Sequence, residues 1–274
     1  MKMDMHALED FLNRKMEEYY QPAFIANDPI SVPHQFKRKQ DIEIAGFFAA
    51  IFSWGNRKTI IQKAKELMQR MDGSPYQFIR DHRPGDLKVF LGFKHRTFNT
   101  TDLLYFISFL KFHYDRHASL ESAFLQYGSG VLPPAGSYPH RIPRAALSGV
   151  EAGLSGFYHY FFSLDDSPLR THKHIASPEK KSTCKRLNMF LRWMVRKDEK
   201  NIDFGIWKQI SPSQLICPVD LHVARVARRF GMVTRKQTDW QTAVDLTGQL
   251  RRFDEKDPVK YDFALFGLGA LEHF

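Results

Sequence analysis

The feature that most constrains the fold of this chain is the spacing of its apolar residues, which recur three and four positions apart. Residues 41–52 show it plainly, because Ile44, Phe47 and Ile51 fall on one side of a helix of 3.6 residues per turn. The same spacing predicts further helices over residues 5–20, 57–71, 101–113, 145–163, 183–195, 220–231, 239–253 and 258–272. Residues 128–143 are rich in Gly and Pro and predict a loop, and only short runs such as 87–91 resemble strands. We therefore predict an all-α fold.

Basic residues outnumber acidic ones, with 40 Lys and Arg against 30 Asp and Glu, so the formal net charge is +10. This balance favours a polyanionic partner, because Lys and Arg that bind phosphates release condensed counterions. Hydrophobic residues make up 43% of the chain and 24 residues are Phe, which argues for a buried core and against disorder.

The cysteines and the N-terminal sequence exclude several classes of protein. Cys184 and Cys217 are too few for a disulfide scaffold or for the four thiolate ligands of an iron–sulfur cluster. No C-x-x-C or H-E-x-x-H run is present, so we expect no metal and no cofactor. Residues 1–20 are too acidic for a signal peptide, and no run approaches the roughly 20 apolar residues that span a bilayer. We expect a cytoplasmic protein with no membrane contact and no obligate protein partner.

The predicted helix over residues 183–195 is amphipathic, and its polar face has two interpretations. Lys185, Arg192 and Arg196 fall opposite the apolar stripe. They form either a basic face in solvent, on a helix packed against the core, or the wall of a groove that binds phosphates. The amphipathic pattern taken alone favours the first interpretation.

Asp220 stands where the N-cap of the following helix belongs. Its carboxylate would accept the first free amide protons of that helix and would favour the positive end of the helix dipole. Gly231 is placed to end the helix. The interpretation that Asp220 is only a cap stays open beside a functional one.

Residues 219–231 read VDLHVARVARRFG, which resembles the V-D-x-H-V-x-R-V-x-x-R-x-G segment of the helix-hairpin-helix DNA glycosylase superfamily. The resemblance implies that Asp220 is catalytic, as the Asp of that segment is in the superfamily. It also implies that Lys185 is a nucleophile. The nucleophilic lysine of the bifunctional members begins the second helix of the hairpin, and Lys185 occupies the matching place.

Two further segments resemble the superfamily. Residues 44–68 look like its early helical pair, whose turn enters the duplex, and residues 261–269 look like its closing helix. The resemblance therefore implies DNA contacts at the turn between the early helices. The residues that we expect to contact DNA are Trp54, Asn56, Arg57, Lys180, Lys181, Arg225 and Arg229.

The chain departs from the superfamily pattern at the hairpin. Residues 175–182 read IASPEKKS and lack the glycines that usually let backbone amides approach a phosphate. The interval of 35 residues between Lys185 and Asp220 is also long. Both features look more like the archaeal 8-oxoguanine DNA glycosylase branch. We expect the chain to belong to an uncharacterised bacterial family within the superfamily.

The resemblance implies a definite chemistry. Cleavage of an N-glycosidic bond leaves positive charge on the sugar, which a carboxylate near C1′ stabilises. A neutral lysine can attack C1′, and the resulting imine permits β-elimination of the 3′ phosphate. We therefore expect a DNA glycosylase with β-lyase activity, which excises a damaged purine such as 8-oxoguanine from double-stranded DNA in base-excision repair. Phe204 and Trp207 are candidates to stack on the flipped base, although such aromatic residues more often belong to a core.

The predicted architecture is two-lobed and resembles that of the glycosylases, with a helix-hairpin-helix and a cleft between the lobes. One lobe spans residues 40–203 and holds Lys185, and the other combines residues 1–39 with 204–274 and holds Asp220. Two alternatives stay open. A non-catalytic nucleic-acid-binding protein on the same fold would bind DNA without releasing a base, and a helical scaffold for other proteins would have negligible affinity for DNA even at low salt.

Overall fold

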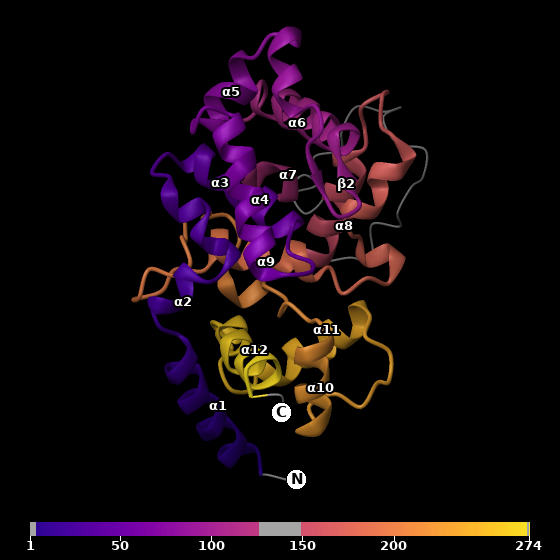
Figure 1. Cartoon of the computed structure of the whole chain (residues 1–274). Helices are drawn as coiled ribbons and strands as arrows, with labels where there is room; N and C mark the ends of the chain where they lie inside the picture. The colour runs from indigo at the N-terminus through magenta and orange to yellow at the C-terminus, as the bar shows by residue number, and fades with distance from the viewer. Residues whose placement is uncertain (1–3, 126–148, 273) are drawn as a thin grey trace. The chain divides into compact units, whose positions relative to one another are not determined.

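The computed structural model describes residues 4–125, 149–272 and 274. These residues are mostly helical, and their only paired strands form a two-residue hairpin of β1 (Lys94–His95) and β2 (Phe98–Asn99) (Figure 1). The prediction of an all-α fold is therefore confirmed. The loop predicted over residues 128–143 and the first part of the helix predicted over 145–163 lie outside the described residues. No helix in the described part of the chain is long and apolar enough to cross a membrane.

The chain divides into two compact units. Unit 1 combines residues 1–26 with 177–274, and unit 2 is the continuous segment 27–176. The predicted boundaries, after residues 39 and 203, differ from these. The difference matters at residues 185–203, because arginines in this segment form ion pairs with acidic residues further along unit 1. Lys185 and Asp220 consequently belong to the same unit.

Unit 2 is built around a cluster of buried phenylalanines. Its α-helices are α3 (Lys39–Ile51), α4 (Arg57–Arg70), α5 (Pro75–Asp81), α6 (Thr100–Tyr114), α7 (Glu121–Leu125) and α8 (Gly149–Phe161). Its 3-10 helices are η1 (Pro29–Ser31), η2 (Pro33–Gln35), η3 (Pro84–Phe90) and η4 (Leu169–His174). Phe106 of α6 lies with its ring centroid 5.7 Å from that of Phe47 in α3 and 4.7 Å from that of Phe161 in α8. The apolar spacing that predicts these helices thus also supplies the side chains that hold them together.

The strand considered for residues 87–91 is wrong. Residues 84–90 form η3, which begins with Pro84 at its first turn. Proline has a fixed φ that suits the start of a helix and no amide proton for a strand partner. A short apolar run does not by itself distinguish a strand from a buried helical turn.

Unit 1 brings the two ends of the chain together. Its α-helices are α1 (Met5–Tyr19), α2 (Ala23–Ala26), α9 (Lys185–Val195), α10 (Leu221–Arg229), α11 (Trp240–Leu250) and α12 (Asp262–Ala270). Its 3-10 helices are η5 (Pro178–Lys180), η6 (Pro212–Gln214) and η7 (Pro258–Tyr261). Helix α12 packs against both α1 and α10 (Figure 1). Glycine makes this possible, because a Cβ at Gly269 would lie 2.9 Å from the carbonyl oxygen of His222 and one at Gly267 would overlap the ring of Tyr19.

Candidate active site

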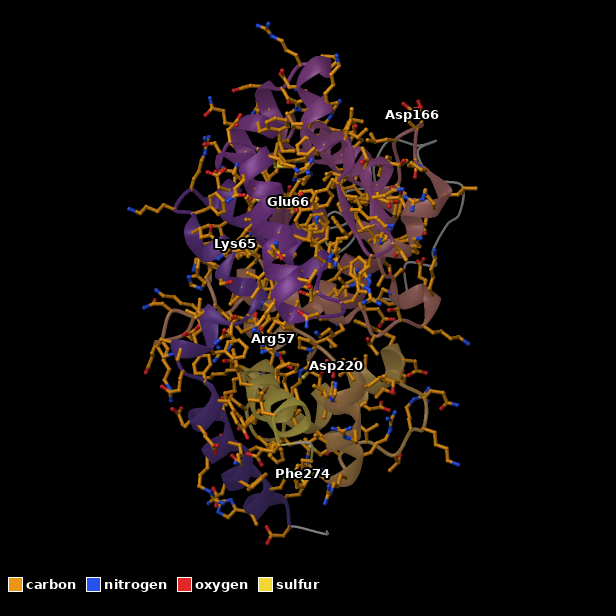
Figure 2. The ribbon with its side chains drawn as sticks, viewed as in Figure 1. Arg57, Lys65, Glu66, Asp166, Asp220 and Phe274 are labelled. Carbon is orange, nitrogen blue, oxygen red and sulfur yellow. The ribbon has the colours of Figure 1, made fainter. Side chains whose placement is uncertain are left out.

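Asp220 is the N-cap of α10, as predicted. Its Oδ1 atom accepts hydrogen bonds from the backbone amides of His222, at 2.9 Å, and Val223, at 3.0 Å. The helix ends at Arg229, and Gly231 follows its C-cap, Phe230, with a φ of 71°, the left-handed conformation that glycine adopts without strain. The two hydrogen bonds fix the carboxylate of Asp220 at the start of α10, and the position of this residue is labelled in Figure 2. The other carboxylate oxygen, Oδ2, remains available to a second partner.

That partner is Lys185, the first residue of α9. Its Nζ atom lies 3.8 Å from Oδ2 of Asp220. The two side chains keep 26% and 25% of their surface exposed, so the pair is screened from water on most sides and still reachable from solvent. The fold therefore joins an amine and a carboxylate that are far apart in the sequence. Together they can supply a nucleophile and a fixed negative charge.

The turn before α9 has an unusual backbone. Lys181 and Cys184 adopt left-handed conformations, with φ values of 57° and 52°. Residues other than glycine rarely adopt this conformation, because their Cβ atom crowds the following carbonyl oxygen. The main chain here adopts a conformation in which glycine is usual, although the glycines of the usual hairpin are absent. A hydrogen bond from the Trp240 amide to the Lys181 carbonyl oxygen, 3.3 Å long, ties the turn to α11.

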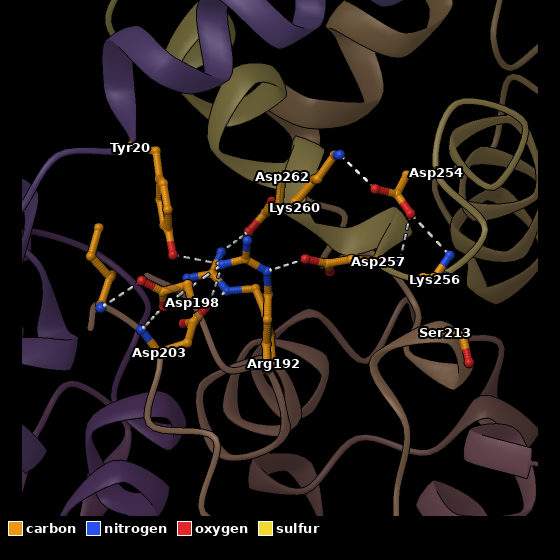
Figure 3. A network of polar contacts seen from close by, with 12 residues as sticks. Tyr20, Arg192, Asp198, Asp203, Ser213, Asp254, Lys256, Asp257, Lys260 and Asp262 are labelled. Atoms are coloured by element: carbon orange, nitrogen blue, oxygen red, sulfur yellow. Dashed lines mark hydrogen bonds and ion pairs between the residues drawn. The ribbon is translucent and has the colours of Figure 1, made fainter. Parts of the chain in front are cut away.

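Two buried arginines on α9 and just after it correct both interpretations of the polar face of this helix. Arg192 and Arg196 expose only 4% and 6% of their surface, so they neither face solvent nor line an open groove for phosphates. Arg192 forms ion pairs with Asp262 and Asp203 (Figure 3). Arg196 forms an ion pair with Asp203 as well. The further partners of Arg196 include Asp257, at 2.7 Å, and the hydroxyl of Tyr20, at 2.8 Å.

Asp262 belongs to this network, and the charges of Lys185 and Asp220 act on it. Burial raises the pKa of Asp262 to about 6, while the positive charges of Arg192 and Lys185 lower it. The negative charge of Asp220 raises it further. Sequence reasoning missed Asp262, because no local pattern distinguishes a buried acid that pairs across 70 residues from any other helix-starting Asp.

Neither cysteine is placed to act as a nucleophile. Both are buried. Burial raises the pKa of the Cys217 thiol well above its usual value, which disfavours the reactive thiolate. Within the described ranges, no group of three or more His, Cys, Asp or Glu residues could hold a metal ion.

The remaining predicted residues of unit 1 lie in different settings. Lys180 and Lys181 are exposed on the turn before α9. Arg225 donates hydrogen bonds to the carbonyl oxygens of Gly269, at 2.8 Å, and Phe274, at 3.0 Å, so its guanidinium is engaged at the C-terminal end of α12. Arg229 is exposed, with its guanidinium carbon 4.1 Å from the centre of the Phe274 ring.

The two aromatic residues proposed for a base pocket differ in burial. Trp207 keeps only 1% of its surface exposed and packs edge-on against Phe190, with ring centroids 5.3 Å apart. This is a core environment, and a base could reach the indole only if the core opened. Phe204 is half-buried, and its backbone amide donates to the carbonyl oxygen of Trp193 at 2.8 Å.

The residues of unit 2 that we expect to contact DNA lie at the turn between α3 and α4, which is where the sequence analysis predicted such a turn. Asn56 is the N-cap of α4, accepting a 3.2 Å hydrogen bond from the Thr59 amide, and Arg57 is the first residue of that helix. Trp54 is half-buried, with its ring edge-on to His95 at 4.8 Å between centroids. Their contact with a duplex stays a prediction.

Comparison with protein families gives a match that covers most of both units. Neither a curated protein nor a solved structure matches the chain. A family model described as "Protein of unknown function (DUF2400)" matches residues 28–271. The chain therefore belongs to the DUF2400 family.

Proposed function

We propose that this protein is a DNA glycosylase with β-lyase activity, in which Lys185 is the nucleophile and Asp220 the stabilising carboxylate. The observation that carries the proposal is the 3.8 Å separation of Lys185 Nζ from Asp220 Oδ2, in a pair that is mostly buried but reachable. The resemblance to the helix-hairpin-helix glycosylases names the same two residues, Asp220 within residues 219–231 and Lys185 at the start of the second hairpin helix. Each residue alone has an ordinary structural explanation, because Asp220 caps α10 and Lys185 lies on the polar face of an amphipathic helix. Neither explanation requires the two side chains to lie next to each other.

The pair divides the chemistry between its members. The neutral Lys185 amine attacks C1′ of the target nucleotide, and the C1′–N bond to the base breaks with its electron pair leaving on the base. Asp220 stabilises the positive charge that develops on the sugar, and its anchoring by two amides holds that charge in place without reorganisation. The product of this step carries both the lysine nitrogen and O4′ on C1′. Transfer of a proton from the nitrogen to O4′ and cleavage of the C1′–O4′ bond open the sugar ring and leave an iminium between Lys185 and C1′. The iminium acidifies C2′, and loss of a C2′ proton to water expels the 3′ phosphate.

The substrate class also follows from the proposal. The target base must leave the duplex first, at a cost of a few kcal/mol, which is smallest for a damaged or mismatched base. The resemblance to the archaeal 8-oxoguanine branch makes a damaged purine the first substrate to test. The exposed Lys180 and Lys181, on the turn that leads to Lys185, are suited to hold the phosphates next to the target nucleotide.

Borohydride trapping tests the proposal directly. The purified full-length protein is incubated with duplexes that contain an abasic site or 8-oxoguanine, and sodium borohydride reduces any iminium to a stable adduct. We expect the wild-type protein to form an adduct and Lys185→Gln to form none, because glutamine cannot make an iminium. Lys200→Gln is the matched control. Lys200 has a similar exposed fraction of 27%, pairs with Glu17 at 2.9 Å and loses the same charge when replaced.

Each other outcome contradicts the proposal in a recognisable way. Firm binding of DNA without adduct or base release by the wild-type protein would indicate a non-catalytic nucleic-acid-binding protein. Negligible binding at low salt would indicate a scaffold for other proteins. An adduct that persists in Lys185→Gln would assign the nucleophile to another amine.

A further inference from the structure

One arginine side chain holds the loop between α10 and α11. Residues 230–239 form this loop, and they bring residues 235–237 back to the end of α10 (Figure 1). There the guanidinium of Arg228 donates hydrogen bonds to three successive carbonyl oxygens. These belong to Arg235, at 2.8 Å from Nε, and to Lys236 and Gln237, at 3.0 and 2.8 Å from Nη2.

The three carbonyl groups also fix the direction of three amides. The peptide bonds here are trans, and in a trans peptide the N–H group points opposite to the C=O group of the preceding residue. The amides of Lys236, Gln237 and Thr238 therefore point away from Arg228. None of the three donates a hydrogen bond to a residue that the structure describes. The outer side of the loop thus carries three backbone donors.

The loop is also positively charged. Lys236 is exposed, and among the described residues neither Lys236 nor Arg228 forms an ion pair. Arg235 pairs with Asp239 at 2.7 Å, so the charges of these two residues offset each other. The Asp239 carboxylate also accepts the Thr242 amide at 3.0 Å as the N-cap of α11, which holds it at the start of that helix. Two positive charges therefore remain uncompensated.

A hydrogen bond joins the end of this loop to the turn before α9. The amide of Trp240, the residue that follows the loop, donates to the carbonyl oxygen of Lys181 at 3.3 Å. Lys180 and Lys181 are exposed on that turn, and Glu179 is the acidic residue next to them. The exposed Lys236 thus belongs to a segment that is hydrogen-bonded to the segment of the other two lysines.

The direction of the amides indicates the kind of anion that fits. Because the three carbonyl groups converge on one guanidinium, the three N–H groups opposite them spread apart. Donors that spread apart cannot surround one small anion, but they suit a chain of phosphates that passes over the loop. Proteins contact the DNA backbone with this combination of lysine, arginine and backbone N–H groups.

We propose that residues 235–238 form a second phosphate-binding surface, which binds the backbone of duplex DNA beside the phosphates held by Lys180 and Lys181. Arg228 is the positioning residue of this surface, because it fixes the loop from its inner side. The inference rests on the proposed function for its choice of DNA as the polyanion, but its test requires no chemistry at a base.

Protection of lysines from acetylation tests the location of the DNA. The full-length protein is acetylated with an N-hydroxysuccinimide ester at low salt, with and without a saturating duplex that contains an abasic site. Mass spectrometry of the peptides gives the rate at each lysine. We expect the duplex to slow acetylation of Lys236 about fivefold or more, because a phosphate contact covers the amine. Lys256, an exposed lysine before η7, is the matched control and should keep its rate.

Inorganic phosphate at the same ionic strength is the second control. It should leave the rate at Lys236 unchanged, because the diverging amides do not enclose a single anion. A Lys236 rate that the duplex does not change overturns the inference. A rate that inorganic phosphate lowers as much as the duplex does also overturns it, because the loop would then bind small anions.

Two substitutions separate the charge of the loop from its position. Lys236→Gln should reduce the slope of log affinity against log salt by about 1, and an unchanged slope would contradict the surface. Arg228→Lys keeps the charge but lacks the rigid fork that holds the carbonyl groups. Its affinity at low salt should fall about fivefold with the slope unchanged, because the loop must then be ordered on binding. Arg252→Lys, an exposed residue just after α11, is the control. Wild-type affinity in Arg228→Lys would end the positioning role.

Failure of this surface and failure of the proposed function give different results. Protection of Lys236 without a borohydride adduct would mean that the glycosylase proposal fails and the phosphate-binding surface stands. An adduct without protection of Lys236 would mean that the surface fails and that Lys185 keeps its proposed role. Absence of DNA binding at low salt would overturn both.

Discussion

The two carboxylate oxygens of Asp220 serve different ends. Oδ1 accepts the amides of His222 and Val223 and thereby begins α10, while Oδ2 faces the Lys185 amine. Capping alone would be satisfied by Ser, Thr or Asn at this position. A purely structural role therefore does not require the negative charge of Asp220. The effect of this charge can be tested separately from capping.

Asp220→Asn separates the two tasks. Asparagine caps helices about as well as aspartate, so the free energy of unfolding should be nearly unchanged. Trapping on 8-oxoguanine DNA, which requires release of the base first, should fall on the order of 10²-fold, because the charge that stabilises the sugar cation is gone. Asp220→Ala should lose the same activity and also about 1 kcal/mol of stability. Urea unfolding and trapping rates, measured on both variants, check the prediction, and an asparagine variant with wild-type trapping would leave Asp220 as a cap only.

At the scale of elements, most of the helices could be predicted from the sequence and the approach to α9 could not. The spacing of apolar residues such as Ile44, Phe47 and Ile51 repeats locally, so it reveals a helix without knowledge of its neighbours. The left-handed backbone at Lys181 and Cys184 has no such signal, because neither residue type favours that conformation. It is imposed by interactions made elsewhere, including the hydrogen bond from the Trp240 amide to the Lys181 carbonyl oxygen.

Strain at Lys181 predicts a stabilising substitution. Lys181→Gly should raise the free energy of unfolding by about 0.5–1 kcal/mol, since glycine adopts a positive φ without a Cβ clash. Lys180→Gly is the matched control, because Lys180 is exposed in η5, where glycine should cost about 0.5–1 kcal/mol instead. Chemical denaturation of both variants gives the comparison. Equal effects at the two positions would mean that the turn before α9 stores no strain.

At the scale of the whole molecule, the sequence reveals how much charge there is but not where it is used. The helical pattern placed Lys185, Arg192 and Arg196 together on the polar face of α9. In the structure, Lys185 is partly exposed, whereas Arg192 and Arg196 are buried among acidic residues. Those acids are Asp203, Asp257 and Asp262, which no local pattern connects to the arginines. Only part of the positive charge of the 40 Lys and Arg residues is therefore free to bind phosphates.

Salt dependence measures that free part. If the protein binds duplex DNA through about six phosphates, its affinity should fall on the order of 10³-fold between about 50 and 200 mM salt. Replacing both Lys180 and Lys181 with Gln should reduce the slope of log affinity against log salt by about 2, because each lysine that neutralises a phosphate adds about 1 to that slope. Lys200→Gln should leave the slope unchanged, because Lys200 pairs with Glu17. Fluorescence anisotropy over a salt series gives these slopes, and a slope that the double variant does not alter would place the phosphates elsewhere.

The joining of both chain ends in unit 1 has a consequence for synthesis on the ribosome. Helix α1 ends at Tyr19 and its partner α12 begins at Asp262, so about 240 residues are translated between them. At the usual rate of about 5–20 residues per second, this takes roughly 12–50 s. The apolar face of α1, which includes Leu8 and Leu12, is buried in the folded unit. During that time this face has no α12 to pack against. A chaperone is therefore most needed on α1 from the time that this helix leaves the ribosome until α12 has been made.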